Sequence, residues 1–172
     1  MSEARMPNRK RSPAFVADAM LGKLTRWLRL LGAKVFFSES KNDDDAIKQA
    51  VKEKAVLLTR NEALAQKAGD YAKTVLFKTN DSFEQLRIVM RKFGLKANGA
   101  QSFALCPKCG GKIKRIVKAK VESRVFPRVF EQQRLFWACG KCKQIYWKGS
   151  HFKKITKKLE AIKRNASNRK TK

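Results

Sequence analysis

The stretch FVADAMLGKLTRWLRLLG, residues 15–32, decides the fold of this chain. It begins with the apolar run FVAD, which predicts a short buried strand ending at Asp18. Apolar residues then recur at helical spacing from Met20 to Leu31, and Gly32 is a natural stop for a helix. A strand that leads directly into a helix indicates an α/β unit, and Asp18 lies at the junction.

The same alternation of strand and helix continues along the chain to about residue 98. Strands that alternate with helices predict a mostly parallel sheet flanked by helices. The last helix is expected to begin at Ser82, because Gln85 follows it at the spacing of a capping box. The other predicted elements are strands at 35–37, 56–59 and 74–77 and helices at 43–54 and 62–68.

Polar residues follow three of the predicted strands: Asp18, the acidic turn 43–45, and Asn61. Ligands of parallel sheets bind beyond the carboxyl ends of the strands, where these residues fall. Grouped carboxylates can hold magnesium or manganese, the cations of a phosphodiester-hydrolysing site. Acids and Asn are also favoured at helix starts, so the same residues could simply cap helices. The pattern leaves both interpretations open.

The four cysteines form two CxxC pairs, CPKC at 106–109 and CGKC at 139–142. Four thiolates suit tetrahedral zinc, and the nearby glycines allow the close backbone approach that a metal knuckle needs. Disulfides are the alternative, but they are disfavoured inside cells, and a redox motif would use a single CxxC at the start of a helix. We therefore predict structural zinc bound by Cys106, Cys109, Cys139 and Cys142.

The segment between the cysteine pairs predicts a β-rich zinc ribbon. IKRIVKAKV, residues 113–121, alternates apolar and basic residues as a half-buried strand does, and 145–147 predicts another strand. Trp137 is expected to be a core residue, because a small ribbon needs its aromatic side chains inside, whereas Trp147 could belong to the core or stack on bases. After the ribbon, Phe152, Ile155, Leu159 and Ile162 form an apolar helical stripe that is expected to dock on it.

The chain carries 41 Lys and Arg against 14 Asp and Glu, a formal net charge of +27. This charge predicts a polyanionic partner, and RNA suits it better than a membrane, because the basic residues are not gathered on one amphipathic helix. We expect a cytoplasmic protein with no membrane partner and no small-molecule substrate. The predicted organisation is a basic tail at 1–13, an α/β domain at 14–98, a zinc ribbon at 103–150, and a basic helix and tail at 151–172.

Candidate RNA-binding residues occur in both predicted domains and in the last helix. Lys23, Arg26 and Arg29 recur every third residue on what is expected to be the polar side of the first helix. His151 is the single histidine and lacks a visible partner, which favours phosphate contact over general-base catalysis. The other candidates are Arg60, Lys112, Lys114, Arg115, Lys118, Lys120, Arg124, Arg128, Lys148, Lys153, Lys154, Lys157 and Lys158.

The order of these motifs resembles the Mut-seven C-terminal ribonuclease domain family, a PIN-like α/β domain fused to a zinc ribbon. The likeness covers FVADAMLGKLTRWLRLLG, the acidic turn, LLTRN, the two CxxC pairs and IYWKGSHF, about residues 14–153. It implies that Asp18 is the first acid of a nuclease metal site and that Asp44 or Asp45 is the second. Asn61 stands at the position of the Asp in the Thr-Arg-Asp motif of the family. A neutral amide is a weaker ligand for hard cations than a carboxylate.

Two functions are compatible with this resemblance. The first is a structural RNA-binding protein on a PIN-like scaffold with a decayed nuclease site, associated with ribosomal RNA and neighbouring ribosomal proteins, which the net charge and Asn61 favour. The second is an active endoribonuclease that uses magnesium or manganese, which Asp18 and the acidic turn favour. A DNA-binding regulator is less compatible, because no base-reading motif is present.

Overall fold

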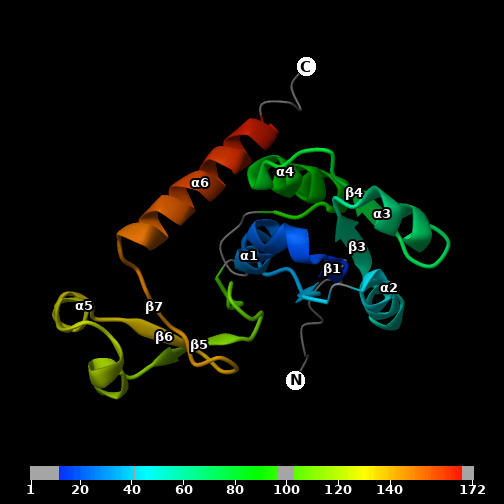
Figure 1. Cartoon of the computed structure of the whole chain (residues 1–172). Coiled ribbons are helices and arrows are strands. Elements are labelled where there is room, and N and C mark those ends of the chain that lie inside the picture. Colours follow the sequence, from blue (N-terminus) through cyan, green and yellow to red (C-terminus); the bar gives the residue numbers. More distant parts are fainter. Residues whose placement is uncertain (1–11, 41, 97–102, 168–172) are drawn as a thin grey trace, which may run out of the picture.

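The computed structural model of the protein describes residues 12–40, 42–96 and 103–167. It confirms the predicted fold class: a four-stranded parallel sheet flanked by helices precedes a three-stranded antiparallel sheet that carries the cysteines (Figure 1). We call residues 14–96 the sheet domain and residues 103–149 the ribbon. Most of the predicted N-terminal tail and the last five residues of the chain lie outside the described residues.

The strands of the sheet domain are all parallel and lie in the order β2-β1-β3-β4. The chain leaves β1 for β2 on one side and then crosses to β3 on the other side of β1. This reversal makes the carboxyl ends of β1 and β3 a topological switch point, the position where α/β proteins bind ligands, and we refer to this position as the crevice. The strands are β1 (Phe15–Ala17), β2 (Val35–Phe37), β3 (Val56–Thr59) and β4 (Thr74–Leu76).

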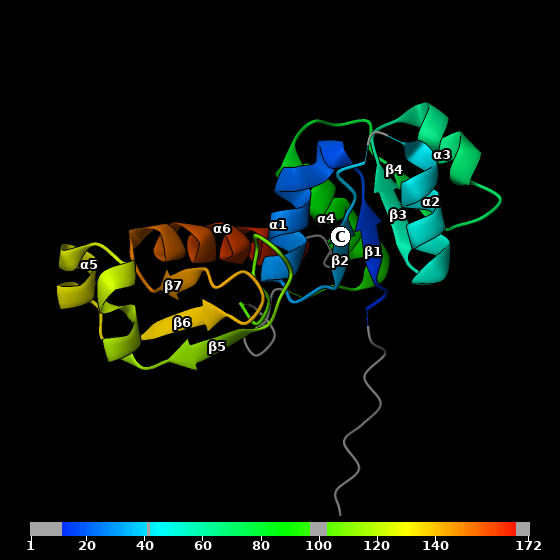
Figure 2. The ribbon, with the colours of Figure 1, turned by 60° about the horizontal axis from the view of Figure 1, so that its bottom comes forward.

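Helices cover both faces of the parallel sheet (Figures 1 and 2). α1 (Gly22–Leu30) and α4 (Ser82–Phe93) pack on one face, and α2 (Asp43–Lys52) and α3 (Glu62–Ala68) pack on the other. The first predicted helix is divided, because a 3₁₀ turn, η1 (Ala19–Leu21), precedes α1. The helices therefore bury β1 and β3 from both faces of the sheet.

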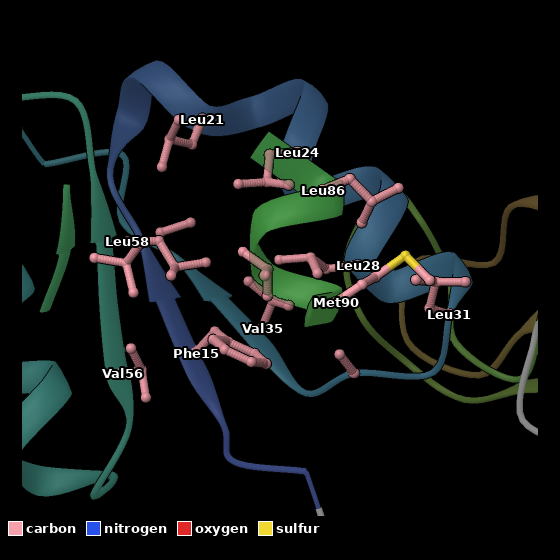
Figure 3. Packing of buried hydrophobic residues seen from close by; sticks show 14 of the residues in the cluster. Phe15, Leu21, Leu24, Leu28, Leu31, Val35, Val56, Leu58, Leu86 and Met90 are labelled. Carbon is pink, nitrogen blue, oxygen red and sulfur yellow. The ribbon is translucent and has the colours of Figure 1, made fainter. Parts of the chain in front are cut away.

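The main core lies between the sheet, α1 and α4 (Figure 3). Phe15 from β1, Leu24 and Leu28 from α1, Leu58 from β3 and Leu86 from α4 are all fully buried. On the other face, β1 and β3 bury further apolar side chains against α2 and α3. Burial of this many large apolar side chains, at roughly 1.5–3 kcal/mol each, stabilises the sheet domain through its own core.

The start of α4 differs from the predicted capping box. Asp81, not Ser82, is the N-cap, and its Oδ1 accepts hydrogen bonds from the backbone N–H groups of Phe83 (2.7 Å) and Glu84 (3.3 Å). The side chain of Gln85 donates instead to the carbonyl of Thr79 (2.7 Å). A carboxylate is a stronger acceptor than a hydroxyl at the positive end of a helix, which explains why Asp81 takes the capping role.

The predicted strand at 113–121 is wrong in its second half. β5 ends at Ile116, because its partner β6 is only four residues long and the ladder ends at the pair Ile116–Phe136. The chain then forms a 3₁₀ helix in which Val121 is fully buried. The ribbon elements are β5 (Ile113–Ile116), η2 (Lys118–Arg124), α5 (Pro127–Gln132), β6 (Phe136–Cys139) and β7 (Ile145–Trp147).

The last helix, α6 (Ser150–Ser167), joins the two parts of the molecule. It was expected to dock its apolar stripe on the ribbon, but Leu159 and Ile162 are buried in the main core of the sheet domain. Phe152 and Ile155, near its start, line a pocket beside the ribbon, and Ile155 also packs against the main core. The helix leaves the end of the ribbon and runs back towards the sheet domain (Figures 1 and 2). The stripe therefore bridges both parts.

Candidate functional site

The four cysteines come together in one cluster. Cys106 and Cys109 precede β5, Cys139 ends β6 and Cys142 lies in the following turn. Their sulfur atoms all lie within 4.8 Å of one another, and the four are free thiols. In the described part of the chain, no other group of three or more His, Cys, Asp or Glu side chains is placed to hold a metal ion. The cluster could thus hold one ion as a complete four-thiolate set.

Backbone geometry explains why this sequence forms the cluster. The first knuckle is closed by hydrogen bonds from the Cys106 N–H to the Gly111 carbonyl and from the Gly110 N–H to the Cys106 carbonyl, both 2.8 Å. Gly110 adopts a positive φ of 75°. A Cβ at Gly111 would lie 2.9 Å from the sulfur of Cys139, so no larger residue fits there without displacing a ligand. Both glycines are needed for the close approach.

The thiols of the cluster share their protons unequally. Burial opposes ionisation of Cys109, but the backbone N–H of Gly111 and the three other thiols lower its pKa to about 6. The N–H of Gln144 favours the thiolate of Cys142, yet burial and the other thiols raise the pKa of Cys142 to about 12. A bound cation would favour the thiolate at both positions, since thiolates are the metal-binding form.

Arg29 has a structural role that the sequence did not reveal. The prediction that it lies on the exposed polar side of the first helix, available to RNA, is wrong in its placement, because Arg29 is only 6% exposed. Its guanidinium donates to the carbonyls of Val35 (3.0 Å) and Lys108 (3.0 Å). Burial lowers its pKa, and the thiols of Cys109 and Cys106 oppose that change. Arg29 thus ties α1 to the first cysteine knuckle.

Asp18 lies at the crevice, as predicted, but both oxygens of its carboxylate already accept hydrogen bonds from groups of the chain itself. It is buried, and its Oδ1 accepts from the backbone N–H of Met20 at 2.8 Å. Its Oδ2 accepts from the hydroxyl of Thr59 and from the backbone N–H of Arg60. Thr59 is fully buried and was not among the candidate site residues, although its place in the LLTRN motif, directly before Arg60, could have identified it.

Asn61 caps α3 and also contacts the acidic turn. Its Oδ1 accepts from the N–H of Leu64 at 3.2 Å, and its Nδ2 donates to Oδ2 of Asp43 at 3.4 Å. Its own backbone N–H donates to the hydroxyl of Thr59, which links it to Asp18. One hydrogen-bonded chain therefore runs from Asp43 through Asn61 and Thr59 to Asp18. We call these four residues the acidic edge.

The two acids expected to complete a metal site beside Asp18 have other partners. Asp44 pairs with Lys67 of α3 at 2.5 Å, and the hydrogen bond from that ammonium lowers the pKa of Asp44. Asp45 is exposed and accepts from the hydroxyl of Ser40 at 2.6 Å. Asp43 is the acid that the fold places against Asn61. Spacing alone could not choose among three consecutive acids, because the choice depends on how α2 is rotated against β3.

All candidate RNA-binding residues other than Arg29 lie at least partly on the surface. Lys23 and Arg26 are exposed on α1, and Arg60 is half-buried beside Asp18. Lys118 is half-buried, with its ammonium 4.6 Å from the ring centre of Phe130. The exposed candidates of the ribbon and α6 are Lys112, Lys114, Arg115, Lys120, Arg124, Arg128, Lys148, His151, Lys153, Lys154, Lys157 and Lys158.

Of the two tryptophans of the ribbon, Trp147, whose role was left open, packs in the core, whereas Trp137, which was expected there, does not. Trp147 packs against the ribbon core of Val121, Phe136 and Ile145. Trp137, expected in that core, lies on the opposite face of the sheet, because it follows Phe136 directly and successive side chains of a strand alternate. It lines a cavity that separates the ribbon from α6. The sequence showed that Phe136 and Trp137 lie on opposite faces of their strand, but it did not show which face the ribbon core covers.

These features define a class of protein: an α/β domain with an acidic residue at its sheet crevice, joined to a four-cysteine ribbon. The chain belongs to the Mut7-C RNAse domain family, whose model matches residues 13–159. Membership of an RNase-domain family indicates a function related to RNA. Comparisons with curated proteins and with solved structures find no match. In the described part of the chain, no helix is long and apolar enough to cross a membrane.

Proposed function

We propose that this protein is a structural RNA-binding protein of the cytoplasm, with ribosomal RNA and neighbouring ribosomal proteins as its partners. Its acidic edge no longer works as a nuclease site. The observation that carries the proposal is the contact between Asn61 and Asp43, in which an amide N–H₂ group donates to the carboxylate at 3.4 Å. At the crevice of a metal-dependent nuclease, those two side chains would both coordinate a cation through their oxygen atoms.

The hydrogen bonds of the acidic edge argue against tight cation binding. Magnesium and manganese prefer anionic oxygen ligands. Asn61 supplies a neutral oxygen that already caps α3, and its amide hydrogens neutralise part of the field at Asp43. The Asp18 oxygens accept from a hydroxyl and two backbone N–H groups, so they are stabilised without metal. A cation would have to displace these hydrogen bonds. It would gain less in return than at a site of three acids, because the neutral Asn61 leaves the acidic edge with one negative charge fewer.

The net charge supports RNA binding. At +27, the chain repels itself, and contact with phosphates relieves this repulsion and releases counterions. Residues 101–172 hold 21 basic and only 3 acidic residues, so most of the excess lies on the ribbon and α6. A nuclease must also release its product, whereas a permanent component of a ribonucleoprotein gains from a charge of this size.

Zinc is the metal proposed for the cysteine cluster. Thiolates are soft ligands, and a set of four closes the tetrahedral shell of zinc without leaving a position for water. Cys106, Cys109, Cys139 and Cys142 would hold it. The metal would supply folding free energy to the ribbon and not chemistry at a substrate, since the closed shell has no open site.

Ribosome association is tested by sedimentation of a cell extract through sucrose at low and at high salt. The wild-type protein is expected to sediment with a ribosomal subunit at both salt concentrations. A matched variant, in which Lys153, Lys154, Lys157 and Lys158 are changed to Gln, should dissociate at the higher salt, because it loses four phosphate contacts. Recovery of the wild-type protein only in the supernatant would contradict the proposal.

The second candidate function is that of an active metal-dependent endoribonuclease. It is favoured by Asp18 and Asp43, which remain at one crevice and are joined through Thr59 and Asn61. Purified protein incubated with single-stranded and structured RNA in the presence of manganese tests it. RNA cleavage that disappears in Asp18→Ala, but persists in the exposed control Asp70→Ala, would establish this function and overturn the structural one.

A further inference from the structure

The ribbon, the sheet domain and the start of α6 line a partly open cavity of about 420 Å³. Five of its lining residues are aromatic and one is basic: Phe103, Trp137, Tyr146, Trp147, Phe152 and Lys148. No lining residue that the structure describes is acidic. The volume lies in the range of pockets that hold small organic groups, roughly 300–1,000 Å³.

The cavity follows from the two apolar faces of the ribbon sheet. Cross-strand partners share a face, so the pair Phe136–Trp147 lies on one side and the pair Trp137–Tyr146 on the other. The first side is covered by Val121 of η2 and by Val129 and Phe130 of α5, and Trp147 packs against this side while also lining the cavity. The second side faces α6 across the cavity. An aromatic surface is therefore left accessible within a cavity.

Several contacts hold the walls in place. The Tyr146 hydroxyl lies 2.9 Å from the sulfur of Cys106, which attaches one wall to the cysteine cluster. Opposite it, the rings of Phe103 and Phe152 pack with their centres 4.5 Å apart. A Cβ at Gly149 would lie 2.8 Å from Nε1 of Trp147, so the chain there approaches the indole closely. The cavity is thus formed before any ligand binds.

Lys148 places a positive charge beside the aromatic walls. It is exposed, and its ammonium lies 5.6 Å from the ring centre of Trp137 and 5.9 Å from that of Phe152. Two further basic residues, Lys153 and Lys154, follow on the exposed side of α6. A ligand that suits both features has a planar aromatic body and an attached anion. A nucleotide combines the two, since its base stacks and its phosphate pairs with a cation.

We propose that this cavity binds one unpaired nucleobase of RNA, with the adjoining phosphate on Lys148. The proposal rests on the RNA binding proposed above and specifies what that RNA must offer: a base released from its helix. A paired base cannot enter, because its faces are covered by its neighbours in the stack. The cavity is expected to select an unpaired base over a paired one, but not one of the four bases over the others, because any base can stack on aromatic side chains.

Three RNA hairpins of one sequence test the proposal. The first contains a single bulged nucleotide, the second is fully paired in its stem, and the third carries an abasic bulge. Affinity is measured by fluorescence anisotropy at fixed salt. The bulged hairpin is expected to bind about tenfold more tightly than the other two, since stacking of one base on aromatic side chains is worth about that factor. Tryptophan fluorescence should change only with the bulged hairpin.

Two pairs of variants locate the effect. Trp137→Leu removes an aromatic wall, and Ile155→Trp fills the cavity from α6; each should abolish the preference for the bulge. Lys148→Ala should weaken binding of the bulged hairpin most. Its control, Lys118→Ala, removes a lysine that lies over the ring of Phe130, away from the cavity, and should weaken all three hairpins equally. Zinc content and circular dichroism verify that each variant is folded.

The outcomes separate this inference from the proposed function. Equal affinity of the wild-type protein for all three hairpins would overturn the base pocket and leave RNA binding intact. A preference for the bulge that persists in both Trp137→Leu and Ile155→Trp would also overturn it. Failure to bind any hairpin would contradict the proposed function itself. Adenosine monophosphate provides a final arm: if it binds as tightly as the bulged hairpin, the cavity is a small-molecule site and not an RNA contact.

Discussion

The cysteine cluster and the acidic edge both contain side chains of metal-ligating types, but only the cluster brings a complete ligand set together. The cluster holds four ligands within 4.8 Å, whereas the acidic edge has an amide at one position and internal hydrogen bonds at Asp18. The surrounding cores explain the difference. In the described part of the ribbon the apolar core has three buried side chains, so we expect the ribbon to need a bound metal, while the sheet domain has a large core of its own. Replacement of an acid at the acidic edge should therefore cost the sheet domain little stability.

Removing the cysteine ligands should have the largest effect. The double substitution Cys109→Ser and Cys142→Ser is expected to reduce zinc from one ion per chain to none and to unfold the ribbon, because structural zinc contributes roughly 10–16 kcal/mol of apparent binding free energy. Metal analysis and circular dichroism measure both changes. As a control from the other region, Asp43→Asn should keep its full zinc content. If the double cysteine variant and Asp43→Asn contained equal amounts of zinc, the ribbon would not depend on Cys109 and Cys142 as ligands.

The contact between the two regions is tested at Arg29. Arg29→Met removes charge-assisted hydrogen bonds to the carbonyls of Val35 and Lys108 and should lower the free energy of unfolding by about 3 kcal/mol. Arg26→Met, one turn earlier on the exposed face of α1, is the matched control and should change it by less than about 0.5 kcal/mol. Thermal denaturation compares the two. Similar melting temperatures would show that Arg29 does not hold the ribbon to α1.

Restoring an acid should make the acidic edge more like the cysteine cluster. Asn61→Asp retains a cap for α3 but replaces the N–H₂ donor to Asp43 with a second carboxylate. Without divalent ions, repulsion and the lost hydrogen bond should destabilise the protein by about 1 kcal/mol. Manganese should reverse this loss and raise Tm above that of the wild-type protein.

The control for this restoration is Asn61→Ser, which keeps a capping oxygen without adding charge. Its Tm should not respond to manganese. An identical manganese response in wild type, Asn61→Ser and Asn61→Asp would show that the edge is not a damaged metal site and that Asn61 is only a helix cap. Asn61→Asp could then be incubated with RNA to test whether cleavage returns.

The smallest effect is expected at Asp44, which pairs with Lys67 and not with the acidic edge. The pKa of Asp44 is lowered by this pair, so its contribution to stability is present above the unfolded pKa of about 3.9 and is lost as the pH falls through the folded value. Asp44→Asn should thus lower Tm slightly near pH 7 and have no effect in acid. A double-mutant cycle with Lys67→Met at low and high salt measures the coupling. A rise in the Tm of the wild-type protein with manganese that Asp44→Asn abolishes would instead place Asp44 in a metal site.

Much of the sheet domain could be predicted from the sequence, because its signals are local. Apolar runs ending at Ala17 and Thr59 and helical periodicity after Gly22 depend on neighbouring residues alone. The cysteine pairs were equally clear, since their spacing is set by the geometry of a metal knuckle. The end of β5 could not be predicted, because it is determined by the length of β6, a strand some twenty residues further along the chain.

The candidate site was predictable only in part for a similar reason. The sequence placed Asp18 and Asn61 at the crevice, but it could not show that Asp43, and not its two neighbours, contacts the amide. Arg29 has the same spacing as Lys23 and Arg26, and only packing against the knuckle carbonyls distinguishes it. Local periodicity gives the face of a helix and does not specify what covers that face.

The sequence by itself determined the α/β alternation, the four thiol ligands and the excess of positive charge, because each depends on residue type and spacing along the chain. Only the tertiary structure decided which residues that are far apart in the sequence come into contact. It placed Asp43 against Asn61, buried Arg29 beneath the ribbon, and inserted Leu159 and Ile162 of α6 into the sheet domain. It also left Trp137 beside a cavity. These contacts join residues far apart in sequence, and they exist only because burial of apolar surface fixes the elements against one another.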